Sequence, residues 1–335
     1  MINWYSVDPM NDIAVSTRIR LARNLKDTPF PSHLTVKQKQ EVCEKVKNAI
    51  LNSDTPFAKS LKYISMSDVP ENEIYAMVER HIISPEFAEK SDGRAVIISE
   101  DESVCVMIGE EDHIRIQVIM PGFALEKAYD LANSIDDLLS NKCGFAYDDQ
   151  LGYLTECPTN LGTGLRASVM LHLPLMESAG AVGEISDTIG KIGFTVRGMY
   201  GEGSKSKASL YQISNQITLG ITEKNAIDNL SVITKQIIER EHSERAKVEK
   251  IALEDVVWRA YGSLKNQRLL SSDEMMSQVS KLKLGIAMGI LPFETALPMK
   301  ILIETGPYML CRKDPNKTPA ERDILRAKTV RNMIP

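Results

Sequence analysis

The sequence predicts an α+β fold, in which an antiparallel sheet flanked by helices is followed by a smaller all-helical domain. Two observations carry this prediction. Short runs rich in Val, Ile and Met alternate with helical spacings through the first 240 residues, and only helical spacings remain after about residue 244. The length of 335 residues agrees with two domains of roughly 150 residues each. We place these domains at residues 1–243 and 244–335.

The first part of the chain alternates between helix-like and strand-like segments. Residues 36–51 carry apolar residues at helical spacing, at positions 36, 42, 46 and 50. Residues 112–120 alternate Ile114, Ile116 and Val118 with polar side chains, which indicates a half-buried strand. The other segments follow in order: strands at 94–99 and 103–109, a helix at 123–140, strands at 168–174 and 193–199 with a helix between them, and a helix at about 221–242.

The second part of the chain shows helical spacing only. Ser271 and Glu274 have the spacing of a capping box, which marks the start of a helix. Two sets of apolar residues repeat at helical intervals: Leu253, Val257, Ala260 and Leu264, and then Met275, Val279, Leu282 and Ile286. Such methionine-rich faces favour a core or a dimer contact over a cofactor site.

Composition excludes several classes of protein. Forty Lys+Arg against 45 Asp+Glu give a net charge of −5, so no global basic field would recruit nucleic acid or an anionic membrane. No apolar run approaches the roughly 18 residues of a membrane helix, and the first residues lack the pattern of a signal peptide. Five scattered cysteines, at 43, 105, 143, 157 and 311, form no CxxC pair and no zinc spacing. We therefore expect a cytoplasmic protein without disulfides.

Five arginines stand in unusual contexts. In an extended chain Ser16, Arg18 and Arg20 share one face, and Glu111, His113 and Arg115 share another by the same period. Arg166 and Arg197 each border a glycine-rich loop. Guanidinium groups bind phosphate oxygens two hydrogen bonds at a time, and glycines let backbone N–H groups approach an anion. The residues allow either a polyphosphate site or a set of solvated strand residues, and spacing alone leaves both open.

One phosphate-binding motif is excluded. Gly198 and Gly203 have the spacing that opens a P-loop, but Ser204 separates Gly203 from Lys205. No GxGxxG motif follows a strand either. ATP, if it binds, does not use either of those cradles.

Four segments together resemble the phosphagen (guanidino) kinases: STRIRLARN, EEDHIRIQ, YLTECPTNLGTGLRASV and RGMYGEGSKS. The resemblance spans about residues 14–240. It implies a catalytic domain like that of phosphagen kinases and glutamine synthetase. Within this family the chain is most similar to the bacterial protein-arginine kinases, because only 15 residues precede Ser16 and because residues 322–327 read RDILRA, the phosphoarginine-binding motif of those kinases. For the second domain the resemblance implies dimerisation and phosphoarginine binding.

The resemblance also implies roles for individual residues. Arg18, Arg20, Arg115, Arg166 and Arg197 would hold the ATP phosphates, and His81 and His113 would flank the nucleotide. The full set implied for ATP is Ser16, Thr17, Arg18, Ile19, Arg20, His81, His113, Arg115, Arg166, Ala167, Ser168, Val169, Met170, Arg197, Gly198, Met199, Tyr200, Gly201 and Glu202. Met170 stands where kinases of small guanidines often have an adenine-packing histidine, and Glu156 is an added charge beside Cys157.

Catalysis and phosphoarginine binding are assigned in the same way. Glu111 would orient and deprotonate the guanidinium, Glu202 would brace its other side, and Cys157 matches the active-site thiol. Cys157 also fits a buried structural cysteine, and on sequence alone the two readings are equal. The phosphoarginine set is Arg322, Asp323, Ile324, Leu325, Arg326 and Ala327, in which two cations would take the phosphate and Asp323 the guanidinium. An ordinary salt-bridged helix face is the alternative for this segment.

The implied function is that of a Mg·ATP-dependent kinase of arginine side chains in proteins, with Mg²⁺ arriving on the nucleotide rather than in a metal site of the chain. An open guanidine side of the cleft would admit an arginine on a protein surface. The alternatives are a kinase of free arginine or another small guanidine, and a phosphoarginine-binding adaptor on a kinase-like scaffold. The resemblance implies a homodimer, a role in bacterial stress response and protein quality control, and three partners: a heat-shock repressor, an AAA+ protease and a zinc-finger activator.

Overall fold

The structure is a computed structural model that describes residues 3–6, 12–198, 207–312 and 314–335. Its centre is an eight-stranded sheet in which every neighbouring pair is antiparallel. The strands lie in the order β2 (Leu61–Ser65), β3 (Ala95–Ser99), β4 (Val104–Ile108), β5 (Ile114–Pro121), β1 (Ala14–Arg23), β8 (Leu165–His172), β10 (Leu210–Asn215) and β9 (Phe194–Gly198). A separate hairpin joins β6 (Tyr147–Asp148) and β7 (Gly152–Tyr153).

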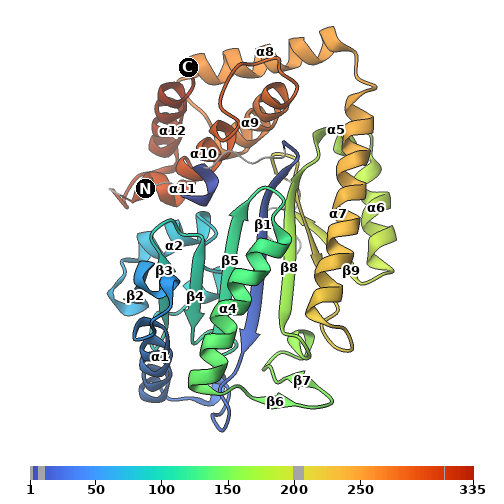
Figure 1. Cartoon of the computed structure of the whole chain (residues 1–335). Helices are drawn as coiled ribbons and strands as arrows, with labels where there is room; N and C mark the ends of the chain where they lie inside the picture. The colour runs from blue at the N-terminus through green and yellow to red at the C-terminus, as the bar shows by residue number, and fades with distance from the viewer. Residues whose placement is uncertain (1–2, 7–11, 199–206, 313) are drawn as a thin grey trace.

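Long helices cover one face of this sheet. They are α1 (Val36–Leu51), α4 (Leu125–Cys143) and α7 (Glu223–Arg245), and Figure 1 shows α4 lying across the strands between the other two. Ile19 and Leu21 of β1 point into this core together with Ala132 and Ile135 of α4, all fully buried. The outward side of α1 is polar, and Thr35 and Gln38 form the capping box that starts it.

Shorter elements complete the first domain. On the β3–β4 side, α2 (Glu71–Glu79) and α3 (Pro85–Ala88) pack over the opposite face of the sheet with their own small apolar cluster. On the other side, α5 (Pro174–Ser178) and α6 (Ala181–Gly190) connect β8 to β9. The short 3-10 helices are η1 (Trp4–Ser6), η2 (Pro31–His33), η3 (Pro56–Ser60), η4 (Met66–Asp68) and η5 (Pro158–Asn160).

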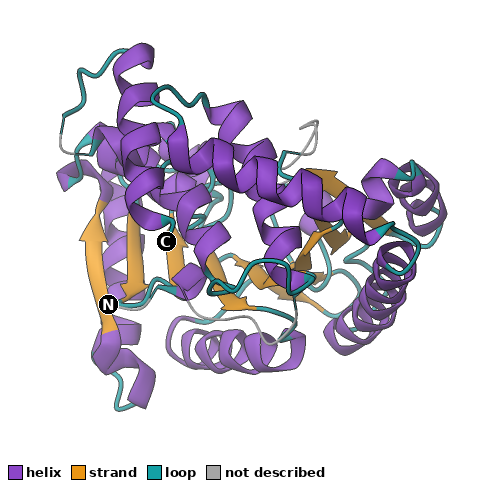
Figure 2. Ribbon diagram, turned by 90° about the horizontal axis from the view of Figure 1, so that it is seen from above, coloured by secondary structure: helices purple, strands orange, loops and turns teal. Residues whose placement is uncertain are grey.

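The C-terminal part is helical, as the spacing predicts. It contains α8 (Lys250–Asn266), α9 (Ser272–Ala287), α10 (Leu297–Glu304), α11 (Pro307–Cys311) and α12 (Pro319–Met333). These helices gather at one end of the sheet (Figure 1), and the view from above shows helices surrounding the row of strands (Figure 2). Ser271 accepts a hydrogen bond from the Glu274 N–H, 3.3 Å, so the predicted helix start is confirmed. No helix among the described residues has the length and hydropathy needed to cross a membrane.

Two features differ from the predicted domain division. Helix α7 continues to Arg245, two residues beyond the predicted boundary at 243. The N-terminal residues Trp4 and Tyr5 lie in the second hydrophobic core, with α9 and α10, rather than in the core of the sheet domain. Three residues in a 3-10 helix carry no periodicity, so the sequence gives no sign of this placement.

Candidate active site

Five arginine side chains line one open cleft on the sheet face opposite α4. Arg18 and Arg20 come from β1, and Arg115, Arg166 and Arg197 come from β5, β8 and β9. In the sheet register Arg20 lies directly opposite Arg166. The cleft has a volume of about 660 Å³, within the range of small-molecule sites. The alternation of the strands therefore brings together the arginines that the sequence singles out.

The arginine cluster is electrostatically unfavourable by itself. Burial, and then the positive charges of Arg166 and Arg115, lower the pKa of Arg18 to about 10. Burial and the three neighbouring arginines lower the pKa of Arg20 well below its ordinary value. Among the described residues neither Arg18 nor Arg20 forms an ion pair, and the Nε of Arg20 is buried without a hydrogen-bond partner. Such a site favours the binding of an anion with several oxygens.

Neutral side chains orient the arginines. The Nη2 of Arg18 donates to Gln212 Oε1 at 3.0 Å, and the Nη2 of Arg166 donates to Ser214 Oγ at 3.3 Å. Gln212 and Ser214 alternate along β10, a strand that the sequence did not predict. Residues 210–215 are Leu, Tyr, Gln, Ile, Ser and Asn, a short run without a regular alternation of polar and apolar side chains.

Two glutamates border the cluster, and they differ in exposure. Glu110 is buried: its carboxylate lies 2.7 Å from Arg115 Nη1 and accepts from Ser84 Oγ at 2.6 Å. The Glu111 side chain is 41% exposed and lies 3.4 Å from Arg115 Nη2. The pKa of Glu111 is raised, mainly by partial burial, although the charge of Arg115 lowers it. Glu111 is therefore the carboxylate that reaches the open cleft.

Cys157 lies beside Glu111. Its Sγ lies 3.0 Å from Thr159 Oγ1, and the nearby thiol lowers the pKa of Glu111 against the larger effect of burial. Asn160 Nδ2 also donates to Glu111, at 3.3 Å. The sequence suggests an electropositive setting near Arg166, whereas the structure places the thiol near the carboxylate of Glu111.

A hydrogen-bond hub fixes the loop that carries Glu111 to the loop that carries Cys157. Asp112 Oδ1 accepts from Asn24 Nδ2 at 2.6 Å and from the Glu156 N–H at 2.9 Å. The Asn24 Oδ1 in turn accepts from the His113 N–H at 2.9 Å. Beside this hub, an added Cβ at Gly164 would lie 2.6 Å from the Ala22 carbonyl oxygen, and its φ is +60°. The chain needs a glycine there to bring the loop against β1.

The structure corrects the expectation for His113. Its ring is buried and does not line the cleft. Nδ1 accepts from the Leu25 N–H at 3.1 Å, and Nε2 lies 2.9 Å from the Pro29 carbonyl oxygen. Residue 113 precedes β5, so the alternation that puts Arg115 in the cleft does not extend to it. His113 holds the loop after β1 in place.

Four further residues of the expected nucleotide set have side chains on the sheet face opposite the cleft. Ile19, Ala167 and Val169 are fully buried in the core beneath α4 and α7. Thr17 donates to the Gly122 carbonyl oxygen at 2.8 Å and accepts from the Ala124 N–H at 2.9 Å. They are the alternate residues of β1 and β8, so their side chains cannot share a face with the arginines.

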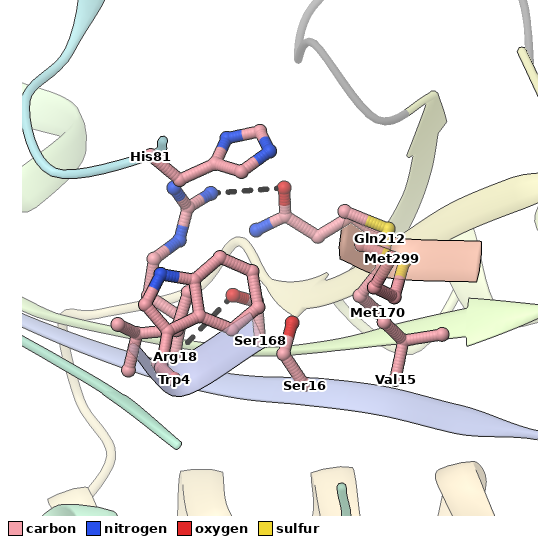
Figure 3. A pocket seen from close by; sticks show the side chains of 10 residues that line it. Trp4, Val15, Ser16, Arg18, His81, Ser168, Met170, Gln212 and Met299 are labelled. Atoms are coloured by element: carbon pink, nitrogen blue, oxygen red, sulfur yellow. Dashed lines mark hydrogen bonds between the residues drawn. The ribbon is translucent and has the colours of Figure 1, made fainter. Parts of the chain in front are cut away.

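The remaining expected residues fall into three sets. Ser16, His81, Ser168 and Met170 line a narrow pocket that adjoins the cleft at Arg18 (Figure 3). Burial, and then Arg18, lower the pKa of His81 to about 3, so its ring is neutral. Gly198 ends β9. Met199, Tyr200, Gly201 and Glu202 lie outside the described residues.

The RDILRA segment lies in the first half of α12, and its two arginines differ. Arg326 is 1% exposed and donates to the carbonyl oxygens of Thr305 at 3.0 Å and Leu270 at 2.8 Å. It also pairs with Asp323. Arg322 is partly exposed and donates to the Lys317 carbonyl oxygen at 3.1 Å. Arg326 therefore uses its Nε and Nη1 donors inside the helical domain. The expectation that both arginines face a ligand stays a prediction. Ile324 is exposed, Leu325 is half-buried and Ala327 is buried.

In the part of the chain that the structure describes, no group of three or more His, Cys, Asp or Glu side chains has the geometry of a metal site. Glu110 and Glu111 are the carboxylates beside the arginines. This donor set fits Mg²⁺, which proteins usually hold with one or two carboxylates together with substrate phosphates and water.

Comparison with known proteins agrees with this geometry. Residues 41–244 match the family described as ATP:guanido phosphotransferase, C-terminal catalytic domain. Residues 250–335 match the family described as Protein-arginine kinase McsB C-terminal domain. A protein-arginine kinase of Halothermothrix orenii is 43% identical over 97% of this chain and 94% of its own. A protein-arginine kinase of Brevibacillus brevis is 41% identical over 99% of this chain and 95% of its own.

Solved structures share the fold of the sheet domain. The duplicated taurocyamine kinase of Schistosoma mansoni, with bound transition-state analogue components, superposes with a TM-score of 0.62 at 26% identity. That match covers 76% of this chain and 38% of the longer, duplicated chain. A lombricine kinase superposes with a TM-score of 0.62 at 22% identity, over 72% of this chain and 70% of its own.

Proposed function

The chain belongs to the protein-arginine kinases of the ATP:guanido phosphotransferase family, and from this premise we propose that its cleft transfers the γ-phosphoryl group of ATP to arginine side chains of proteins. One observation carries the proposal. Five arginines whose charges favour the binding of a polyphosphate share a cleft with Glu111, a partly exposed carboxylate suited to a guanidinium. The two sets of charges lie where a phosphate donor and a cationic acceptor would meet.

The chemistry needs positioning and charge neutralisation more than covalent catalysis. Arg18, Arg20, Arg115, Arg166 and Arg197 would bind the phosphate oxygens and stabilise the charge on the departing ADP. Mg²⁺, carried on the nucleotide and near Glu110 and Glu111, would supply further neutralisation.

The acceptor presents a second difficulty. A guanidinium with a pKa above ~12 has no free lone pair at neutral pH. Glu111 would orient the acceptor and take one proton from it as the nitrogen attacks phosphorus, while the bond to the ADP oxygen breaks. We assign Glu202 to the opposite side of the guanidinium, on the resemblance alone.

Cys157 is proposed as a positioning residue for Glu111. Its thiol lies near the carboxylate that Asn160 and Arg115 contact, and it would help to hold Glu111 in one orientation. A modest loss of rate in a Cys157→Ser variant, rather than a complete loss, is the expected consequence.

We also propose a second site on α12, where Arg322 and Asp323 contact a phosphoarginine and Arg326 holds Asp323 in place. The resemblance to protein-arginine kinases further supports a homodimer through the helical domain and a cytoplasmic role in stress response and protein quality control. A heat-shock repressor, an AAA+ protease and a zinc-finger activator are the partners it implies. All five cysteines are free thiols, which is consistent with a reducing compartment.

The test of the catalytic site is a Glu111→Gln variant. The amide keeps the shape and the contacts with neighbouring donors but cannot take the proton. We expect transfer to an arginine-containing protein to fall by about 10²–10⁴-fold, with Mg·ADP affinity changed by less than about two-fold. Glu86→Gln, at the rim of the same cleft, is the matched control. Retained transfer by Glu111→Gln would remove Glu111 from the mechanism.

A further inference from the structure

The narrow pocket beside the arginine cluster is mostly apolar. It shares Arg18, His81 and Gln212 with the large cleft, so the two spaces adjoin. Its apolar lining consists of Trp4, Val15, Ile119, Met170 and Met299. In Figure 3, Trp4 stands on one side, Met170 and Met299 stand on the other, and Ser16 and Ser168 lie between them. An apolar slot that opens onto phosphate-binding groups fits a molecule with a flat ring at one end and phosphates at the other.

Two of these lining residues lie outside the core and the strands of the sheet domain. Trp4 belongs to η1 near the start of the chain, and Met299 belongs to α10 of the helical domain. Both lie in the second hydrophobic core, which also contains Val15 of β1 and Ile119 of β5. Figure 1 shows the N-terminal residues beside α10 and α11. The slot therefore lies at the seam between the two domains.

We propose that Trp4 and Met299 are two walls of the site for the nucleotide base, so that the N-terminal segment and the helical domain take part directly in nucleotide recognition. The inference rests on the proposed function, because it requires the phosphates of the same nucleotide to lie on Arg18 and its neighbours. An indole and a thioether both make favourable contacts with an aromatic ring. The base would lie between Trp4 on one side and the two methionines on the other.

The slot is too narrow in this structure to hold a base without movement of its walls. Its free space of about 20 Å³ holds little more than one water molecule. Met170 and Met299 must therefore change rotamer to admit a ring. Methionine is suited to this movement because it is unbranched and has three rotatable bonds.

Residues 79–81, at the end of α2, connect the slot to the helical domain. The Glu79 carboxylate accepts from the Tyr308 N–H at 3.0 Å and the Met309 N–H at 2.8 Å, at the start of α11. The Arg80 carbonyl oxygen accepts from Trp4 Nε1 at 3.3 Å. His81, in the left-handed conformation at φ 60°, lines the slot itself. Three consecutive residues thus contact α11, Trp4 and the slot, and they link the helical domain to it.

Trp4 provides the first test. The chain has two tryptophans, and Trp258 is 51% exposed on α8, so a Trp258→Phe variant leaves Trp4 as the only indole. This variant is titrated with Mg·ADP and, separately, with Mg·tripolyphosphate, which has phosphates but no base. We expect a saturable change in Trp4 emission with ADP and little change with tripolyphosphate, although both bind. An equal response to the two ligands, or no response to bound ADP, would overturn the inference.

Met299 provides the second test. A Met299→Trp variant fills the slot, and Met288→Trp places the same ring on an exposed methionine of the helical domain, at 39% exposure. We expect ADP affinity to fall about ten-fold or more in Met299→Trp, the size of a lost base stack, with tripolyphosphate affinity unchanged. Unchanged ADP affinity in a folded Met299→Trp variant would contradict the base site. If the parent protein binds neither ADP nor tripolyphosphate, the proposed phosphate site is overturned, and the inference with it.

Discussion

Arg20 lowers the stability of the unliganded fold but favours the binding of an anion. It lies opposite Arg166, it is surrounded by further arginines, and its Nε is buried without a partner. Like charges opposite each other in a sheet are destabilising. The described fold offers Arg20 no ion pair, so the missing negative charge must come from a ligand.

An Arg20→Met variant tests both effects, on stability and on nucleotide binding. Methionine fills a similar volume without charge, so we expect the free energy of unfolding without nucleotide to rise by about 1–2 kcal/mol. Mg·ADP affinity should fall by about ten-fold or more, the size of a lost charge-assisted hydrogen bond. Thermal unfolding and calorimetric titration measure the two quantities on the same sample. A variant that is less stable than the parent and binds ADP equally well would show that Arg20 is a structural residue.

The pH dependence of catalysis follows from Glu111. Its pKa is raised above the ordinary 4.5, chiefly by burial, and a general base must be ionised. We therefore expect kcat to fall as the pH drops through this raised pKa, at values above 4.5. The folded state binds this proton more tightly than the unfolded chain does, so Glu111 itself does not favour unfolding as the pH falls.

The rate at which ADP forms from ATP with a protein substrate, measured between about pH 4 and 8 alongside the unfolding temperature, checks this expectation. The acid limb should be absent from the residual activity of Glu111→Gln. A kcat that stays constant down to the ordinary glutamate pKa would contradict the assignment.

At the scale of single elements, α12 separates a structural arginine from a candidate ligand. Removing Arg326 leaves the Thr305 and Leu270 carbonyl oxygens without their donor. We expect Arg326→Ala to lower the free energy of unfolding by roughly 2–4 kcal/mol, and Arg322→Ala to change it by less than about 0.5 kcal/mol.

Binding of a phosphoarginine peptide distinguishes the two residues further. Arg322→Ala should weaken peptide binding about ten-fold while the unfolding temperature stays unchanged. A variant that also lacks Arg326 would lose stability, so it could not separate binding from folding. A peptide that binds Arg322→Ala as tightly as the parent would remove Arg322 from the second site, and Asp323→Asn would then test the remaining contact.

The elements also show what the sequence can and cannot predict. Helix 36–51 is confirmed to the residue because its apolar spacing and its polar capping residues agree. Strands β2 and β10 were not predicted, since each is short and mixes polar with apolar side chains. The place of His113 beside the nucleotide was taken from the resemblance, and the structure instead puts this residue before β5 with its ring buried against the loop after β1. Local periodicity identifies elements but not their ends.

At the scale of the whole molecule, two hydrophobic cores meet beside the arginine cluster. The first lies between the sheet and α1, α4 and α7, and the second joins the C-terminal helices to Trp4, Val15 and Ile119. The sequence predicts the α+β domain and the helical domain, because these depend on alternation and spacing. The convergence of the arginines follows from the resemblance to the guanidino kinases, since spacing alone leaves it open. The slot at the seam could not be predicted, because Trp4 and Met299 meet only through tertiary packing.

The central claim is that this cleft phosphorylates arginine in proteins. The most direct test runs two parallel reactions with Mg·ATP, one on an unfolded model protein and one on free arginine, with products mapped by mass spectrometry under non-acidic conditions. The proposed function predicts phosphoarginine on the protein, little product on free arginine, and neither product with Glu111→Gln. Product on free arginine alone would make the chain a kinase of small guanidines. No product on either substrate, from a protein that binds Mg·ADP, would contradict the catalytic account and favour a phosphoarginine-binding scaffold.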